Sequence, residues 1–320
     1  MSEIVGLVLP FFGLIFLGFG VGRLRGIPPE GLAGLEFFIF YAAMPALFFT
    51  LVADAPPSDV PVWPFVVTTA FATYCAFAVA FSIGALVNAG NVPEATVEGL
   101  VGSHANIGYM APGLVIAAFG PAAALPMALI FSFDTAMLFT LTPLMMALGG
   151  TGRADLPSIV DQIVRRVALH PFVIATAAGL LAATLHLEMP GAVDGLLTLL
   201  ANAAAPAALF TLGVGLAFRR VGAFHVEMAV LLGVKLVVHP LIVYLLLSWV
   251  GGFDPIWIHT AVLIAALPPA AGVAMLAKRY NTYADRAATA VVAGAVASVA
   301  TVTVILILLL NEVLPVHPFP

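Results

Sequence analysis

Two ionisable side chains lie at the middle of long apolar segments, where a charge is costly. Asp134 falls near the centre of the apolar run 122–148, and Lys235 near the centre of the run 224–250. At the centre of a bilayer a charged side chain costs about 2.5–3.5 kcal/mol on insertion scales, so each residue needs a reason to be there. Lys235 could hold an anion, and Asp134 could couple to a proton or a cation. The alternative is structural, with the two residues paired to each other.

Two histidines could share this chemistry, because imidazole exchanges a proton near neutral pH. His239 lies one helical turn after Lys235 and therefore on the same face of a helix. His104 lies in another apolar run, 95–119. We interpret both histidines, like the buried aspartate, as candidates for proton or ion coupling. The alternative for His239 is that it only fills a polar gap.

Two apolar runs, 95–119 and 256–278, are interrupted at their middle by residues that disfavour a helix. Proline removes a backbone donor, glycine weakens a helix, and unpaired backbone at membrane depth survives only when it is buried in protein or lines a wet cavity. Together with Lys235, the candidates for substrate binding are Asn106, Gly108, Tyr109, Pro112, Pro268, Pro269 and Gly272. Half-helix N-termini carry partial positive charge, so such a site favours a small organic anion.

Purely structural explanations of the same residues stay open. The breaks could be simple proline kinks, which are common in membrane helices. Asn106 could bond only to the freed backbone, and Tyr109 could pack in the core instead of lining a pore.

The composition is that of a membrane protein. Hydrophobic residues make up 62% of the 320 residues and charged residues 8%, with a mean hydropathy of +1.15. Because a soluble chain carries roughly 25% charged residues, this chain cannot cover a water-facing surface. A net charge of -5 with no basic patch argues against nucleic-acid binding. The single Cys75 excludes a disulfide scaffold, and we expect no metal ion or cofactor beyond H⁺ or Na⁺ as coupling ion.

Apolar runs of about 20 residues are long enough to cross the hydrocarbon as helices. The sequence contains ten such runs: 4–22, 31–53, 62–88, 95–119, 122–148, 170–187, 190–217, 224–250, 256–278 and 284–311. Ten of the 11 basic residues fall in the odd-numbered loops between them: Arg23, Arg25, Arg153, Arg165, Arg166, Arg219, Arg220, Lys278, Arg279 and Arg286. Cytoplasmic loops carry an excess of Lys and Arg, so this pattern predicts ten crossings with both termini extracytoplasmic. We expect a multi-pass protein of the cell (inner) membrane whose first run is a span and not a signal peptide.

The two halves of the sequence match at an offset of 161 residues. The matching positions are Pro10-Phe11 with Pro171-Phe172, Gly18 with Gly179, Ala43 to Ala46 with Ala204 to Ala207, and Phe49 to Leu51 with Phe210 to Leu212. The offset covers five runs, an odd number, so the second copy must be inverted, as in many secondary transporters. We predict an all-α integral membrane fold of two inverted five-helix repeats, 1–148 and 170–320, joined by a cytoplasmic linker, 149–169. Broken helices 4 and 9 would cross.

At these residues the chain resembles the auxin efflux carrier family, which includes bacterial malonate and malate permeases. The resemblance covers nearly the whole chain and is most specific at 106–112, 235–240 and 266–280. It implies a ten-helix transporter related in fold to bile-acid symporters and sodium/proton antiporters. Helices 1, 2, 6 and 7 would form a scaffold, often a homodimer, and helices 3–5 and 8–10 a mobile transport unit.

Some positions depart from the pattern of that family. Gly272 stands where a polar residue, commonly Asn, is found, and Pro269 replaces a small polar residue. The ninth run lacks the acidic residue that bile-acid symporters use for sodium, and the fifth has one aspartate where the antiporters have two. Sodium coupling therefore has little support.

The expected function is secondary active or facilitative transport of small organic anions, such as malonate, malate or auxin-like acids. Transport would proceed by alternating access, with substrate bound where helices 4 and 9 cross. The alternative is a carrier-like membrane receptor or sensor without net transport, including one with a chromophore on Lys235. We do not expect an enzyme, because the sequence has no His-Glu-x-x-His, no Gly-x-Ser-x-Gly and no paired intramembrane aspartates.

Overall fold

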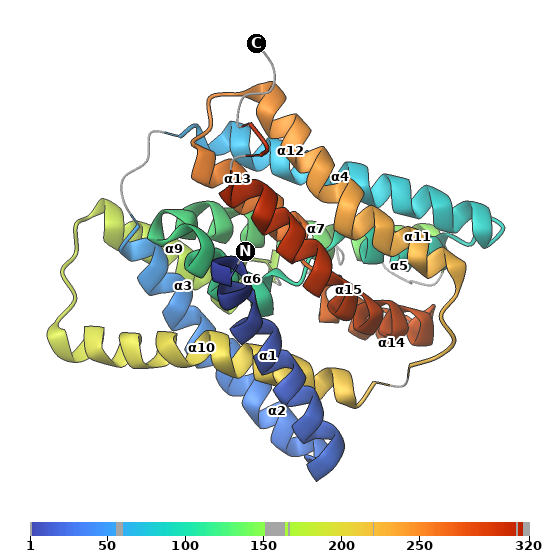
Figure 1. Ribbon diagram of the computed structural model, residues 1–320, viewed down its shortest axis with the longest axis horizontal. Helices are drawn as coiled ribbons and strands as arrows, with labels where there is room; N and C mark the ends of the chain where they lie inside the picture. Colours follow the sequence, from blue (N-terminus) through green and yellow to red (C-terminus); the bar gives the residue numbers. More distant parts are fainter. Residues whose placement is uncertain are drawn as a thin grey trace. The chain divides into compact units, whose positions relative to one another are not determined.

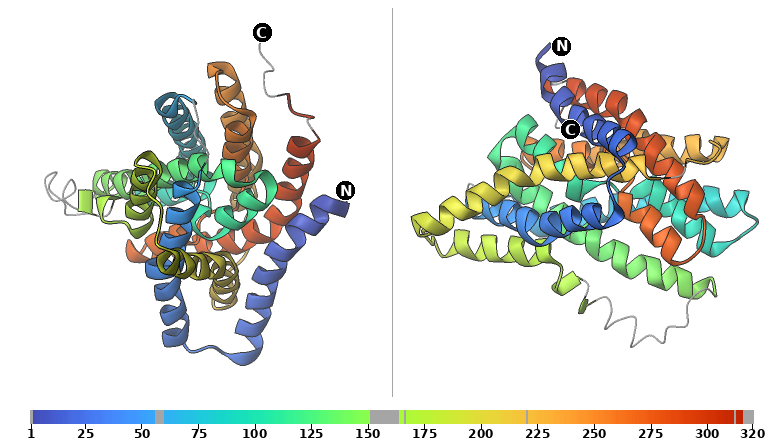
Figure 2. Two further views of the ribbon diagram at one scale, coloured as in Figure 1. Left: turned by 90° about the vertical axis from the view of Figure 1, so that its left-hand side faces the viewer. Right: turned by 90° about the horizontal axis from the view of Figure 1, so that it is seen from below.

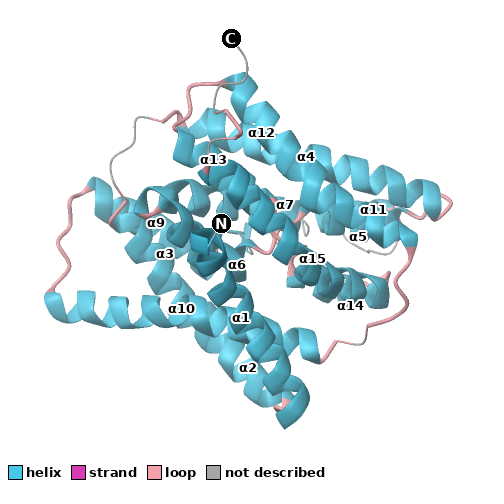
Figure 3. Cartoon of the chain, in the orientation of Figure 1, coloured by secondary structure: helices cyan, strands magenta, loops and turns pink. Residues whose placement is uncertain are grey.

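The computed structural model of the chain describes residues 2–55, 60–150, 164–165, 167–219, 221–311 and 313–315. Within these ranges every regular element is a helix and no β-strand occurs (Figure 3). The predicted all-α class is therefore confirmed. Most of the predicted linker 149–169 lies outside the described residues.

Figure 1 shows the helices in their order along the chain. In order they are α1 (Ser2–Arg25), α2 (Pro29–Phe38), η1 (Ile39–Ala43), α3 (Met44–Ala53), α4 (Val62–Val87), α5 (Val92–Ser103), α6 (Ile107–Phe119), η2 (Pro121–Ala123), α7 (Ala124–Leu148), α9 (Pro171–Thr184), α10 (Gly191–Ala217), α11 (Val226–Gly233), η3 (Val234–Val238), α12 (His239–Val250), α13 (Pro255–Ala265), α14 (Ala271–Arg279) and α15 (Ala284–Leu310). The elements η1 and η3 are π-helices, and η2 is a 3₁₀-helix.

Seven of the described helical segments are long and apolar enough to cross a bilayer. They are Gly6–Arg25, Glu30–Ala53, Val62–Val87, Pro121–Leu148, Gly191–Ala217, Val226–Val250 and Ala284–Leu310. Shorter apolar helices occupy the other three predicted spans: Ile107–Phe119, Pro171–Thr184 and Pro255–Ala265. The fourth and ninth spans are short because each is divided into two helices. The count of ten crossings and their inverted repeat stay predictions.

The chain divides into two compact units. The first unit comprises Met1–Asp59, Gly108–Ser132 and Arg165–Phe218, and the second comprises Val60–Ile107, Phe133–Val164 and Arg219–Pro320. The first unit thus contains α1 to α3, α9 and α10, together with nearly all of α6 and the beginning of α7. The second unit contains α4, α5, the rest of α7 and α11 to α15.

Glycines let helix backbones meet in the first unit, where α1 packs on α10 and α3 packs on α9 (Figures 1 and 2). A Cβ atom at Gly18 would lie 2.1 Å from the carbonyl oxygen of Phe210. A Cβ atom at Gly179 would lie 2.7 Å from the carbonyl oxygen of Phe49. Small residues allow this close approach between membrane helices. The two contacts join positions that match at the offset of 161 residues.

In the second unit, α4 packs against α5 and α12, and small residues again fill the contact. A Cβ atom at Gly99 would lie 2.6 Å from the ring of Phe77, and one at Gly102 would lie 2.3 Å from the Cβ atom of Ala80. Side-chain caps begin two helices here. Asn91 accepts from the backbone N–H of residue 94 at the start of α5, and Asp254 accepts from that of residue 256 at the start of α13.

Candidate functional site

The breaks in the fourth and ninth spans lie side by side in the second unit. Helix α5 ends at Ser103 and is followed by extended backbone at His104. Helix α13 ends at Ala265, and after a turn at Ala266 and Leu267 the backbone is extended at Ala270, before α14 begins. The backbone N–H of Asn106 donates to the carbonyl oxygen of Pro268 (2.9 Å), and that of Ala270 donates to the carbonyl oxygen of His104 (3.0 Å). These bonds form an isolated antiparallel bridge. Each break therefore supplies hydrogen-bond partners for some of the backbone N–H and C=O groups that the other break leaves unpaired. Burial in a membrane requires such pairing.

The side chain of Asn106 takes no part in this backbone pairing. Both cross-break bonds are made by the main chain, so the freed backbone does not need the Asn106 amide. The residue is 4% exposed, so its amide is buried at the first break.

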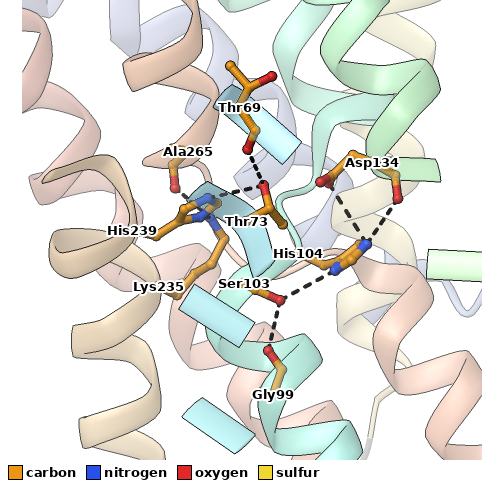
Figure 4. Close-up of polar contacts among 9 residues, drawn as sticks. All are labelled: Thr69, Thr73, Gly99, Ser103, His104, Asp134, Lys235, His239 and Ala265. Carbon is orange, nitrogen blue, oxygen red and sulfur yellow. Dashed lines mark hydrogen bonds and ion pairs between the residues drawn. The ribbon is translucent and has the colours of Figure 1, made fainter. Parts of the chain in front are cut away.

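Lys235 is fully buried and ties the second break to the eighth span. It lies on the π-helix η3 with 0% exposure. Its ammonium donates to the carbonyl oxygen of Ala265, the last residue of α13, and lies 3.2 Å from Nδ1 of His239 (Figure 4). Turns of π-helix inside α-helices are frequent at functional sites, because they shift a side chain out of the regular helical pattern.

His239 lies between Lys235 and α4 and contacts both. A lysine can only donate, so Nδ1 of His239 accepts and Nε2 carries the proton. Nε2 lies 3.4 Å from the hydroxyl of Thr73, which in turn donates to the carbonyl oxygen of Thr69 at 3.2 Å (Figure 4). Thr73 also neighbours the carboxylate of Asp134. Because a hydroxyl hydrogen rotates, Thr73 can face either acceptor.

His104 completes the network at the first break. Its Nε2 donates to the carbonyl oxygen of Asp134 at 3.1 Å and lies 3.9 Å from carboxylate Oδ2 of the same residue. Its Nδ1 is 3.4 Å from the hydroxyl of Ser103, which donates to the carbonyl oxygen of Gly99 (Figure 4). A chain of polar groups therefore runs from one break to the other. The direct Asp134–Lys235 pair considered from the sequence is not formed: histidines contact both residues instead.

The structure brings some of the predicted site residues together and leaves others apart. The network collects His104, Asp134, Lys235 and His239, and the adjacent breaks hold Asn106, Pro268 and Pro269. Three further predicted residues, Gly108, Tyr109 and Pro112, lie on α6 within the first unit. Gly272 is in the first turn of α14, and a Cβ atom there would have no atom within 4 Å. None of these positions contradicts the predicted roles, and none tests them.

Sequence reasoning missed Thr73 and Ser103 as members of the network. Both are buried, and both also bond to a carbonyl of their own helix. The threonine series Thr68, Thr69 and Thr73 does not single out Thr73, because all three hydroxyl groups bond to carbonyl oxygens of their own helix.

In the part of the chain that the structure describes, no three His, Cys, Asp or Glu side chains are placed so that they could hold a metal ion. A groove of about 370 Å³ in the second unit is lined almost entirely by apolar side chains of α12, α13 and α15. Its lining contains no charged side chain.

Several long apolar helices and a buried polar network at adjacent helix breaks define a multi-pass membrane protein of the transporter class. The comparison with known proteins agrees with this class. The sequence profile of the family described as "Membrane transport protein" matches residues 3–306. The chain belongs to this family, the auxin efflux carrier family that its motifs predicted.

A relative supports the same assignment. A protein of Rhizobium meliloti (strain 1021), named "Putative malonate transporter", is 46% identical over 321 residues, covering 100% of both chains. The prediction of a membrane transporter rather than an enzyme is therefore confirmed.

Proposed function

We propose that the protein is a secondary carrier of small organic anions, with malonate or a related dicarboxylate as substrate, that works by alternating access. The observation that carries this proposal is the polar network joining the adjacent breaks through Lys235, His239, Thr73, Asp134 and His104. Ionisable groups inside a membrane protein are costly, and they typically mark substrate or ion pathways. Binding sites at broken helices are a recurrent feature of secondary transporters.

An anionic substrate is favoured by the charges at the second break. Lys235 is a cation, and the first turn of α14 has no side-chain cap, so its backbone N–H groups and partial positive charge remain for a ligand. The amide of Asn106 adds a donor. The name of the Rhizobium relative fits a dicarboxylate, which needs two such attachment points.

Lys235 cannot reach a substrate in this conformation, because it is fully buried and held by Ala265 and His239. We infer that substrate binding draws the ammonium away from the Ala265 carbonyl. The remaining proposed substrate contacts are Gly108, Tyr109, Pro112, Pro268, Pro269 and Gly272. Binding would thus be coupled to the position of the second break.

Coupling to protons is the proposed role of Asp134, His239 and His104. Each can change its charge, and Thr73 lies between them with a hydroxyl that can switch acceptors. A proton taken up at Asp134 would weaken its attraction for His104. Loss of this attraction would free the first break to move.

Two compact units are what a mobile transport unit and a scaffold require. The first, second, sixth and seventh spans, proposed as the scaffold, fall in the first unit, which also contains Gly108–Ser132 from the fourth and fifth spans. We further propose a homodimer through these spans in the cell (inner) membrane, with both termini extracytoplasmic.

Electrophysiology on solid-supported membranes tests the substrate class. Proteoliposomes containing the protein would be exposed to malonate, malate, lactate and indole-3-acetate, at equal concentration and pH. We expect saturable currents with the dicarboxylates. Absence of a response to every carboxylate, together with absence of substrate-induced thermal stabilisation, would refute the organic-anion proposal.

A further inference from the structure

Glu98 is a carboxyl-bearing residue that is completely buried in the second unit, more than one helical turn before the first break. Its exposure is 0%. One carboxyl oxygen, Oε2, accepts a hydrogen bond of 2.9 Å from the side-chain amide of Asn88. The other, Oε1, is buried and has no hydrogen-bond partner among the described residues. Burying a charged oxygen without a partner is far more costly than burying a neutral one, so this environment favours the protonated acid.

The backbone of α4 makes room for this carboxyl group. A Cβ atom at Gly84 would lie 1.9 Å from Oε2 of Glu98 and 2.7 Å from its carboxyl carbon. These distances are far below van der Waals contact, so the carboxyl group rests directly on the helix backbone. Any larger residue at position 84 would displace it. The close contact between the Glu98 carboxyl group and the α4 backbone therefore requires glycine at position 84.

A second carboxylate lies near the first. Glu227, in the first turn of α11, interacts electrostatically with Glu98. Its Oε1 accepts hydrogen bonds from the hydroxyl of Tyr283 and, at 3.1 Å, from Nη1 of Arg286. The guanidinium of Arg286 also lies over the Tyr283 ring, 5.5 Å from its centroid. Arg286 is therefore engaged by Glu227, and Tyr283 stands between the two carboxyl groups.

Tyr283 is held in a conformation that fixes this geometry. It precedes α15 with a left-handed backbone, φ 53°, which is costly for a bulky residue and persists only where the surroundings enforce it. Burial raises the pKa of the Tyr283 hydroxyl above its ordinary value, with its hydrogen bond to Glu227 acting in the same direction. The hydroxyl therefore stays a donor.

The charges around Glu98 do not balance unless a proton is bound. Glu227 and Arg286 neutralise each other, which leaves Glu98 with a neutral amide and a neutral hydroxyl. Glu94, one turn earlier on α5, adds negative charge, and Lys235 on the neighbouring η3 is engaged in the network described above. An unpaired buried carboxylate is far more costly than a buried carboxylic acid. One proton makes the group formed by Glu98, Glu227 and Arg286 neutral.

We propose that Glu98 is a proton-binding site, separate from the Lys235 network, where one proton is held among α4, α5, α11 and the start of α15. Release of that proton places a second negative charge beside Glu227 and loosens the packing of α5 against α11 and α15. The site makes this end of the second unit sensitive to pH. It depends on no particular substrate and goes beyond anion transport.

Infrared spectroscopy of the full-length protein in lipid bilayers tests the site, because a protonated carboxyl group has a carbonyl band that a carboxylate lacks. We expect this band at neutral pH in the wild-type protein and its loss in Glu98→Gln. Asp134 is present in both proteins, so the difference spectrum isolates Glu98. The matched control Glu94→Gln, a partly exposed carboxylate on the same helix, is expected to leave the band unchanged.

Equal carboxylic acid bands in wild-type protein and Glu98→Gln would overturn the proposal. Glu98→Gln imitates the neutral acid in size and charge, so it is expected to fold. If it is not recovered folded, Asn88→Ala decides, because it retains Glu98 and removes the hydrogen bond that the Asn88 amide donates to its carboxyl group. A carboxylic acid band at a new wavenumber in Asn88→Ala supports the site, and an unshifted band contradicts it.

Discussion

Thr73 joins the two ends of the buried network, and its hydroxyl is the part that matters. It lies 3.4 Å from Nε2 of His239 and beside the carboxylate of Asp134. We predict that Thr73→Val, which keeps the shape and removes the hydroxyl, slows substrate counterflow about tenfold. This corresponds to about 1.4 kcal/mol, near the upper end of the range for a typical hydrogen bond. Initial rates in proteoliposomes measure the effect.

Thr69 provides the matched control on the same helix. Its hydroxyl bonds only to carbonyl oxygens of its own helix, those of Phe65 and Val66. Thr69→Val is therefore expected to stay within about twofold of wild type, since loss of such a local bond has little net effect. Equal slowing in both variants would assign the effect to α4 as a whole and contradict the role of Thr73.

The ionisable members of the network could be found from the sequence, and the hydroxyl members could not. Asp134 and Lys235 stand out because a charge in an apolar run is costly, and His239 follows from its spacing. Thr73 gives no such signal, because a threonine in an apolar helix commonly bonds to the carbonyl four residues earlier. The partners were also unpredictable, since histidines from different elements separate the lysine from the aspartate.

Helix packing in the first unit depends on glycines that match between the two halves of the sequence. A Cβ atom at Gly18 would lie 2.1 Å from the Phe210 carbonyl oxygen, which belongs to the backbone of α10 and cannot move aside easily. We predict that Gly18→Ala lowers the free energy of unfolding by about 1–3 kcal/mol, the usual cost of overpacking. Thermal unfolding in detergent, followed by labelling of the single Cys75 with a thiol-reactive dye, measures the change in Tm.

Gly13 on the same helix is the control for this substitution. A Cβ atom there would have no neighbour within 4 Å, so Gly13→Ala is expected to leave Tm unchanged or slightly raised. If Gly18→Ala and Gly13→Ala unfold at the same temperature, α1 does not pack on α10 through Gly18 as described.

Proline and glycine showed where the fourth and ninth spans break, because their effect on a helix is local. The two breaks are joined by hydrogen bonds from Asn106 to Pro268 and from Ala270 to His104. These residues lie more than 160 positions apart, so the local sequence does not predict the bonds. The π-helices were also unpredicted, since an extra residue in a helical turn is set by packing. Lys235 owes its position to one of them.

The orientation of the whole molecule in the membrane rests on the distribution of its basic residues. We predict that a cysteine replacing Glu188 faces the outside and one replacing Lys278 faces the cytoplasm, both in a Cys75→Ser background. Both positions are exposed in the structure. A membrane-impermeant maleimide added to intact cells is expected to label Glu188→Cys at once and Lys278→Cys only after permeabilisation. The reverse pattern would invert the proposed topology.

Counterflow of radiolabelled malonate in proteoliposomes tests the central claim most directly, because it detects exchange whether or not transport carries current. The account predicts saturable counterflow in the wild-type protein and at least a tenfold loss in Lys235→Ala. The chain's other lysine gives the control: Lys278 is exposed at the end of α14, and Lys278→Ala is expected to retain wild-type exchange. Wild-type exchange in a folded Lys235→Ala would contradict the proposed role of the buried lysine network.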